Sequence, residues 1–166
     1  MLLAGPLDIL PADREDIPLL AELYVRSCQL RGVKIIRLNK EGQLERRPAF
    51  SDLVADKKIK LLAEFEEGKT DIFKAVYPQE NLVLGYHASK RVKNNGYDAA
   101  LLTDYYALPS DKKAGSALMN HFLEKSRQEN IEMITLCPTR YAIPIYDHYG
   151  FKESQGNMYL LLPAIH

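Results

Sequence analysis

Residues 101–119 read LLTDYYALPSDKKAGSALM, and this stretch sets the order of the elements around it. Its first seven residues favour a β-strand, because leucine and tyrosine side chains pack well on a pleated surface. The proline, serine and aspartate at 109–111 end that strand with a turn. The lysines and small residues at 112–117 then open a helix that continues through Leu118 and Phe122. The stretch therefore predicts a strand, a turn and a helix in immediate succession.

This predicted junction is suited to binding an anion. The first turn of a helix has backbone N–H groups without partners, and the helix dipole adds positive potential there. Gly115 and Ala117 leave the backbone uncovered so that a phosphate can approach closely, and Lys112 and Lys113 add charge. An ordinary strand-to-helix turn with solvated lysines explains the same residues equally well, because short glycine-containing matches are weak evidence.

A second informative stretch, residues 139–151, reads TRYAIPIYDHYGF and follows an apolar strand predicted at 133–137. Together the two stretches fit two sequence patterns in order and in spacing. The patterns are P-x-x-(Q/R)-x-x-G-x-(G/A) and N-x-x-A-x-x-L-Y-x-x-x-G-F. The matching positions are Pro109, Gly115 and Ala117 in the first pattern, and Ala142, Tyr146, Gly150 and Phe151 in the second.

Over residues 98–153 the chain therefore resembles the GNAT-type N-acetyltransferases, enzymes that move an acyl group from coenzyme A to an amine. Two positions depart from the family patterns: Lys112 stands where Gln or Arg is usual, and Thr139 stands where Asn is usual. Lysine keeps the positive charge but lacks the planar fork of arginine. Threonine keeps one short hydrogen-bonding group. Both departures bear on coenzyme affinity more than on fold.

The resemblance implies a mixed α/β architecture, the GNAT fold, with a central sheet of about six to seven strands flanked by about four helices. It implies one domain over residues 1–166 and acetyl-CoA as co-substrate, without a metal. The expected reaction is direct acetyl transfer to a primary amine in a ternary complex. The acceptor classes left open are a polyamine, an amino sugar, an amino acid, an antibiotic amine and a protein amino group. The alternative is a GNAT-fold module that binds acyl-CoA or a partner without turnover; a homodimer is a further analogy with the family.

The resemblance also assigns roles to residues. Tyr146 matches the family's general acid, which protonates the coenzyme thiolate; a tyrosine packed in the core explains the same position. Asp104 stands where family members often carry a carboxylate that acts on the amine directly or through water; a surface charge or a salt bridge is the other interpretation. The coenzyme is expected to meet the backbone of Tyr106 and Ala107, the loop residues Lys112, Lys113, Ala114, Gly115, Ser116 and Ala117, and Thr139.

Composition restricts the class of protein. The chain has 166 residues, and its 22 basic and 22 acidic side chains cancel, so nothing marks it as a nucleic-acid binder. Cys28 and Cys137 are expected to be free thiols in a reducing cytoplasm, and they lack metal-ligand spacing. The N-terminal MLLAGPLDIL is too short for a membrane span or a signal sequence.

The rest of the chain predicts an alternation of helices and strands. A strand at 7–10 precedes a helix that begins at Asp13, with Asp16 completing the first turn, and ends at Gly32. Residues 33–50 are left open as an extra hairpin, a substrate loop or a solvated insertion. Further elements are expected as a helix at 51–67 capped by its first two residues, strands at 72–77, 82–89 and 97–108, a helix at 114–130, strands at 131–137, 151–154 and 158–163, and a short helix at 142–149.

The histidines receive separate predictions. His87, on the strand before the central one, is a candidate for the acceptor pocket. His121 is expected to lie on the surface or to fill the core. His148 is expected to point away from the side of the short helix that carries Tyr146.

Overall fold

Seven strands form one mixed sheet in a computed structural model that describes residues 5–163. The spatial order is β1-β2-β3-β4-β5-β7-β6. Only β4 and β5 run parallel; the other neighbouring pairs are antiparallel. The strands are β1 (Asp8–Pro11), β2 (Thr70–Tyr77), β3 (Leu82–Asn94), β4 (Tyr97–Ala107), β5 (Met133–Leu136), β6 (Lys152–Ser154) and β7 (Asn157–Leu161).

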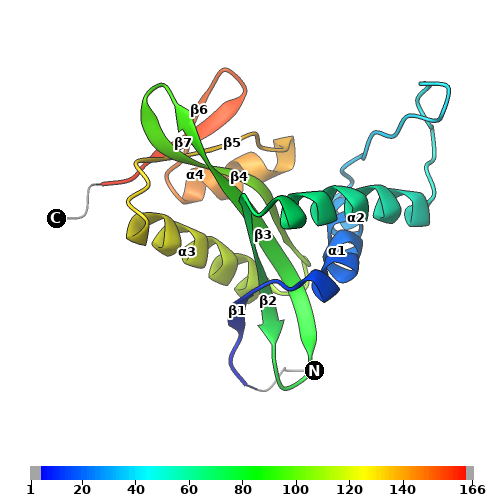
Figure 1. Ribbon diagram of the computed structural model, residues 1–166, viewed down its shortest axis with the longest axis horizontal. Helices are drawn as coiled ribbons and strands as arrows, with labels where there is room; N and C mark the ends of the chain where they lie inside the picture. The colour runs from blue at the N-terminus through cyan, green and yellow to red at the C-terminus, as the bar shows by residue number, and fades with distance from the viewer. Residues whose placement is uncertain (1–4, 164–166) are drawn as a thin grey trace.

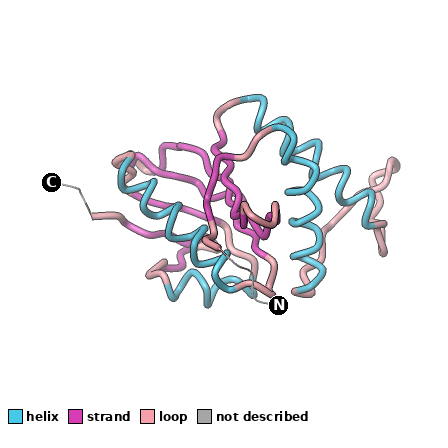
Figure 2. The backbone as a smooth tube through the Cα atoms, turned by 90° about the horizontal axis from the view of Figure 1, so that it is seen from below, coloured by secondary structure: helices cyan, strands magenta, loops and turns pink. Residues whose placement is uncertain are grey.

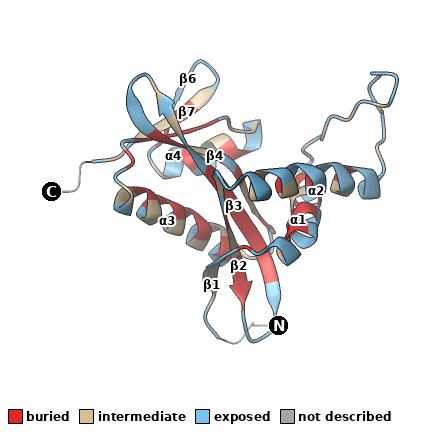
Figure 3. Cartoon of the chain, in the orientation of Figure 1, coloured by how far each residue is buried: buried red, intermediate tan, exposed pale blue. Residues whose placement is uncertain are grey.

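The main helices pack on both faces of this sheet, as Figures 1 and 2 show. One hydrophobic cluster joins α1 and α2 to β2 and β3. A second cluster joins α3 to β2, β3 and β4, and a third joins α3 and α4 to β4, β5 and β7. Figure 3 shows the buried residues concentrated on the central strands and on the inward sides of the helices. The predicted mixed α/β architecture is confirmed. The helices are η1 (Arg14–Asp16), α1 (Ile17–Leu30), α2 (Phe50–Glu67), α3 (Lys112–Gln128), η2 (Arg140–Ala142) and α4 (Ile143–His148).

The entry to α1 follows from its sequence. Asp13 and Asp16 form a reciprocal capping box, in which the Asp13 amide donates to the Asp16 carboxylate at 2.7 Å. The first turn is a short 3-10 helix, so the α-helix itself begins later, at Ile17. The helix ends beside Gly32, which adopts the left-handed conformation with φ 69° that favours glycine.

The parallel pair β4 and β5 separates soon after it forms. Only three registered pairs join the two strands, from Ala99↔Met133 to Leu101↔Thr135, yet β4 continues to Ala107. Beyond Leu101, the edge of β4 that faces β5 has no strand partner in the described part of the chain. A V-shaped opening therefore forms in the sheet at the carboxyl ends of the two strands.

Several element boundaries differ from the predictions. α2 begins at Phe50, one residue before the predicted start, and its N-cap is Ala49 instead of Ser51 or Asp52. α3 begins at Lys112, as the stretch at 112–117 predicted, because Asp111 caps it; it ends at Gln128, two residues before the predicted end. β3 continues to Asn94, because it pairs with β4 as far as the turn at 95–96.

Residues 33–49 form a projecting segment between α1 and α2, seen beyond the outer end of α2 in Figure 1. It contains no β-strand, and one isolated β-bridge joins Leu38 to Leu44. Arg37 ties the segment to α2 through Asp56 at 2.8 Å and also pairs with Glu45. Within residues 5–163, no helix is both long and apolar enough to cross a membrane.

Candidate active site

A cavity of about 480 Å³ occupies the opening between β4 and β5. Its walls come from the ends of these two strands, the start of α3, the segment from β5 to α4, and the residue that follows α1. The separation of the parallel strands creates the space, and the turn after β4 brings the start of α3 to its rim. The predicted site residues that line it are Tyr106, Ala107, Lys112, Gly115, Ser116, Thr139 and Tyr146.

The other predicted site residues do not line the cavity. Lys113 and Ala117 lie on the first turns of α3 but do not line the cavity. Ala114 lies on the same helix and is fully buried against the sheet. Asp104 is buried on β4, below the cavity wall. Seven of the predicted site residues thus line the cavity, and the other four lie close to it without lining it.

Tyr146 presents its ring from α4 to the cavity and is only 7% exposed. The ring packs between Phe151 and Tyr105, with centroids at 5.6 Å and 6.1 Å. Burial is the main reason why the pKa of the Tyr146 hydroxyl is raised well above its usual value, with smaller effects from Tyr141 and Asp104. The phenol is therefore protonated at neutral pH and can donate a hydrogen bond into the cavity.

The backbone of β4 alternates in direction along this wall. The Leu108 amide donates to the Leu84 carbonyl at 2.9 Å, which fixes the register with β3. In an antiparallel pair every second residue faces the partner strand, so the N–H and C=O groups of Ala107 and Tyr105 face the free edge. Those of Tyr106 face β3, where a Cβ on Gly85 would lie 2.5 Å from the Tyr106 carbonyl oxygen.

Asp104 belongs to a buried polar cluster between β4 and α2. Its two carboxylate oxygens accept hydrogen bonds from the Lys57 ammonium at 3.1 Å and 2.9 Å, and one also accepts from the Tyr86 hydroxyl at 3.1 Å. Lys57 lies 4.1 Å from the centre of the Tyr24 ring. Sequence analysis missed Lys57, although it occupies a core-facing position on α2 between Leu53 and Leu61.

The N-terminus of α3 is occupied by a carboxylate of the chain itself. One oxygen of Asp111 accepts from the amides of Lys113 and Ala114 at 2.9 Å and 3.1 Å, and the other accepts from the Tyr77 hydroxyl at 3.1 Å. Two of the amides that were expected to meet a phosphate are thus already hydrogen-bonded. An anion that binds here has to displace Asp111 or use the amide and ammonium of Lys112 and the hydroxyl of Ser116, because the amides from Gly115 onward donate within the helix.

Comparison with solved structures identifies the fold of the chain. The chain is similar to a PaiA N-acetyltransferase from Thermoplasma acidophilum in complex with coenzyme A, with 19% identity, 95% of this chain and 100% of that chain covered, and a TM-score of 0.72. It is also similar to a predicted acetyltransferase from Clostridium acetobutylicum with acetyl-CoA, with 16% identity, 90% of this chain and 92% of that chain covered, and a TM-score of 0.67. A third similar structure is a GNAT family acetyltransferase from Brucella melitensis in complex with acetyl-CoA, with 14% identity, 97% of this chain and 92% of that chain covered, and a TM-score of 0.64. The chain has the GNAT fold. No family model and no curated protein matches its sequence.

In this GNAT fold, Arg31 is a cavity residue that sequence analysis missed. It follows α1, and its guanidinium donates to the Ala107 carbonyl at 2.8 Å and lies 5.4 Å from the centre of the Tyr141 ring. The sequence did contain a signal for it. Arg31 continues the row of inward-facing residues on α1 formed by Leu20, Tyr24 and Ser27. Helical spacing therefore predicts that its side chain points toward the interior of the protein rather than into solvent.

Two histidines of this GNAT fold differ from their predictions, whereas His121 is half-buried against Phe73 and His87, as a residue that helps to fill the core. His87 lies on the α3 face of the sheet, where its Nε2 is 3.0 Å from Nδ1 of His121, and it is not part of the cavity lining. Burial lowers the pKa of His87 to about 3, with smaller effects from His121 and Lys125. His148 lines the cavity, so the prediction that it points away was wrong.

The two thiols are unpaired: Cys28 is buried, and Cys137 is exposed at the cavity. Among the described residues, no group of three or more His, Cys, Asp or Glu side chains is placed to hold a metal ion.

Proposed function

We propose that this protein transfers the acetyl group of acetyl-CoA to a primary amine by direct attack in a ternary complex. One observation supports the proposal above others. The protonated Tyr146 hydroxyl reaches a cavity whose opposite wall is the free edge of a β-strand that leads to a helix N-terminus. Such a wall offers backbone groups to an extended amide-containing arm and an end-point for its phosphates. Solved GNAT-fold structures with coenzyme A or acetyl-CoA bound are consistent with this use of the cavity.

For the coenzyme, we propose that the pantetheine amides pair with the backbone groups of Tyr105 and with the amide of Ala107, since the Ala107 carbonyl already accepts from Arg31. The diphosphate would then lie at the start of α3, near Lys112, Gly115 and Ser116, with Lys113, Ala114 and Ala117 shaping the turn behind it. Thr139, in the segment between β5 and η2, would meet the arm near the point where β4 and β5 separate. Lys112 is exposed and has no carboxylate within ion-pair distance among the described residues, so its charge is available to a phosphate.

In the chemical step the leaving sulfur gains a proton and the attacking amine loses one. The amine nitrogen forms a bond to the carbonyl carbon, the carbon–sulfur bond breaks, and the Tyr146 hydroxyl gives its proton to the leaving sulfur. The proton lost by the amine returns to Tyr146 through solvent. For Asp104 we propose the role of base through water rather than by direct contact, because Lys57 and Tyr86 occupy its oxygens and it lies outside the lining.

The test combines binding with turnover. Acetyl-CoA should raise the unfolding temperature of the protein, since a ligand that binds only the folded state stabilises it. Release of free thiol should follow with at least one amine from a panel covering the five acceptor classes, and mass spectrometry should show a product heavier by one acetyl group. The absence of any shift with acetyl-CoA would rule out the proposal.

A second function, an acyl-CoA sensor without turnover, is favoured by one observation. Asp104, the proposed base, is paired with the buried ammonium of Lys57, which opposes its use in proton transfer. Stabilisation by acetyl-CoA together with no thiol release across the whole amine panel would favour the sensor over the enzyme.

A further inference from the structure

Arg31 is a partly buried cation at the cavity with hydrogen-bonding capacity to spare. A guanidinium carries five N–H donors. In the described part of the chain it donates to the Ala107 carbonyl and interacts with the Tyr141 hydroxyl, and no carboxylate lies within ion-pair distance of it. The partly buried or buried lysines Lys57, Lys74 and Lys125 are all paired with carboxylates. Arg31 thus brings an unpaired positive charge with donors to spare to the lining of the cavity.

The charges of the cavity wall agree with an anionic ligand. Asp111 is the one acidic residue of the lining, and its oxygens already accept bonds from Lys113, Ala114 and Tyr77. Asp104 lies outside the lining, paired with Lys57. A polyamine acceptor would therefore meet a guanidinium and no free carboxylate, which opposes its binding.

The position of Arg31 separates two sources of such an anion, a carboxylate on the acceptor and a phosphate of the coenzyme. Arg31 reaches the cavity from the face of the sheet that carries α1 and α2. The proposed phosphate site lies at the start of α3, which packs on the other face and has Lys112 of its own. The Tyr141 ring centre lies 5.4 Å from the guanidinium carbon, and a planar guanidinium offers the paired hydrogen bonds that a carboxylate accepts.

We propose that the acceptor is a primary amine that also carries a carboxylate, as an amino acid does, and that Arg31 binds this carboxylate. The inference rests on the proposed function, since it names the acceptor class of the same site. Within the acceptor classes that the sequence left open, it selects amino acids and excludes polyamines.

The experiment measures binding of matched products to the protein saturated with coenzyme A. N-acetylalanine, N-acetylphenylalanine and Nα-acetyllysine are each compared with the corresponding carboxamide by calorimetry. The free acid should bind about tenfold more tightly than the amide for at least one pair, because a charge-assisted bidentate pair is lost in the amide. Arg31→Met should remove that difference, and Arg31→Lys should restore part of it. Arg26→Met, an exposed cation on the same helix, should leave it unchanged.

The outcomes separate this inference from the function itself. Equal binding of acids and amides, or no binding of any product, overturns the inference. So does an Arg31→Met variant that weakens coenzyme A binding about tenfold while the acid-to-amide ratio persists, since that result assigns Arg31 to a phosphate. Thiol release with the parent amino acids is measured separately. Preference for the acids without any thiol release supports the carboxylate site and counts against the transferase.

Discussion

At the scale of single residues, Tyr146 is proposed to assist the reaction of the coenzyme, whereas Asp111 is expected to weaken its binding. The Tyr146 phenol is protonated at neutral pH and lines the cavity, so a proton is present there, but burial raises its pKa and makes it a weaker acid. The Asp111 carboxylate lies where phosphate oxygens are proposed to bind and competes with them for two amides. The proposed chemistry therefore depends on the first side chain and is opposed by the second.

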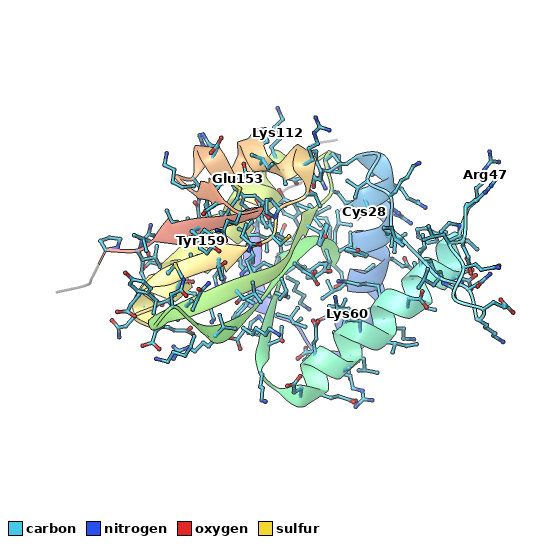
Figure 4. All side chains as sticks on the ribbon, turned by 90° about the horizontal axis from the view of Figure 1, so that it is seen from above. Cys28, Arg47, Lys60, Lys112, Glu153 and Tyr159 are labelled. Carbon is cyan, nitrogen blue, oxygen red and sulfur yellow. The ribbon has the colours of Figure 1, made fainter. Side chains whose placement is uncertain are left out.

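Replacing Tyr146 with phenylalanine removes the proton donor and keeps the ring. We expect kcat to fall about 100-fold or more, the usual contribution of a positioned acid, while the affinity for coenzyme A changes little. Steady-state thiol release and calorimetry measure the two quantities. Tyr159→Phe, on β7 and labelled in Figure 4, is the matched control away from the cavity. An unchanged kcat would remove Tyr146 from the mechanism.

Replacing Asp111 with asparagine keeps an N-cap side chain and removes its charge. We expect coenzyme A to bind roughly three- to tenfold more tightly, with a smaller gain at high salt, because a repulsive charge at the helix N-terminus is gone. Calorimetry at two ionic strengths checks this, with Glu153→Gln on β6 as the control. Weaker binding in Asp111→Asn would show that the carboxylate helps rather than hinders the coenzyme.

At the scale of elements, one buried ion pair joins α2 to the central strand β4. Lys57 and Asp104 are 7% and 6% exposed, and they come together over 47 residues of sequence. Each charge is satisfied by the other, by Tyr86 and by the ring of Tyr24. The pair therefore fixes how α2 lies over the strand that forms the cavity wall.

Breaking this pair from one side leaves a buried charge without compensation. We expect Lys57→Met alone or Asp104→Leu alone to lower the free energy of unfolding by about 3–5 kcal/mol. The double variant should lose much less than the sum of the two, because no charge is left unpaired. Urea unfolding measures all three, with Lys60→Met on the same helix as a control that should stay within about 0.5 kcal/mol of the parent. Additive losses would show that the two side chains are not coupled.

At the scale of the whole molecule, His87 makes stability depend on pH. It is fully buried against Phe73, Phe122 and His121, with Lys125 nearby, and its pKa is lowered to about 3. In the unfolded chain the imidazole takes up a proton near pH 6.5, while in the folded state it does so only near pH 3. The unfolded state thus binds more protons in this window, and stability is lost as the pH falls through it.

For this reason we expect the free energy of unfolding to decline between about pH 6.5 and pH 4 by an amount on the order of a few kcal/mol. His87→Leu should flatten this decline, and the exposed cavity residue His148→Leu should not. Urea unfolding at intervals of pH provides the measurement. The same slope in the parent and in His87→Leu would assign the acid sensitivity to other groups.

The projecting segment at 33–49 also belongs to this scale. Figures 1 and 4 show it reaching outward past α2, with Arg47 at its outer part and Lys112 well away from it. None of its residues lines the cavity, which favours the solvated insertion among the alternatives left by the sequence. The length of the segment follows from the sequence, but its direction and the exposure of Ile36, Leu38 and Leu44 do not.

The sequence by itself determined the features that depend on near neighbours. The strand, turn and helix at 101–119, the capping box at Asp13 and Asp16, and the helix that carries Tyr146 each arise from spacing, small residues or side-chain caps within a few positions. These local signals carried the resemblance to the GNAT family from which the fold was predicted, and seven of the eleven predicted site residues line the cavity.

Only the tertiary structure decided which distant side chains meet. Arg31 reaches Ala107 across 76 residues, and Lys57 reaches Asp104 across 47. The occupation of the α3 amides by Asp111 also needed coordinates, since a cap and a phosphate site look alike in sequence. The physical reason is that such contacts are set by how helices pack on the sheet and by where β4 and β5 separate, and these depend on the whole core rather than on any one segment.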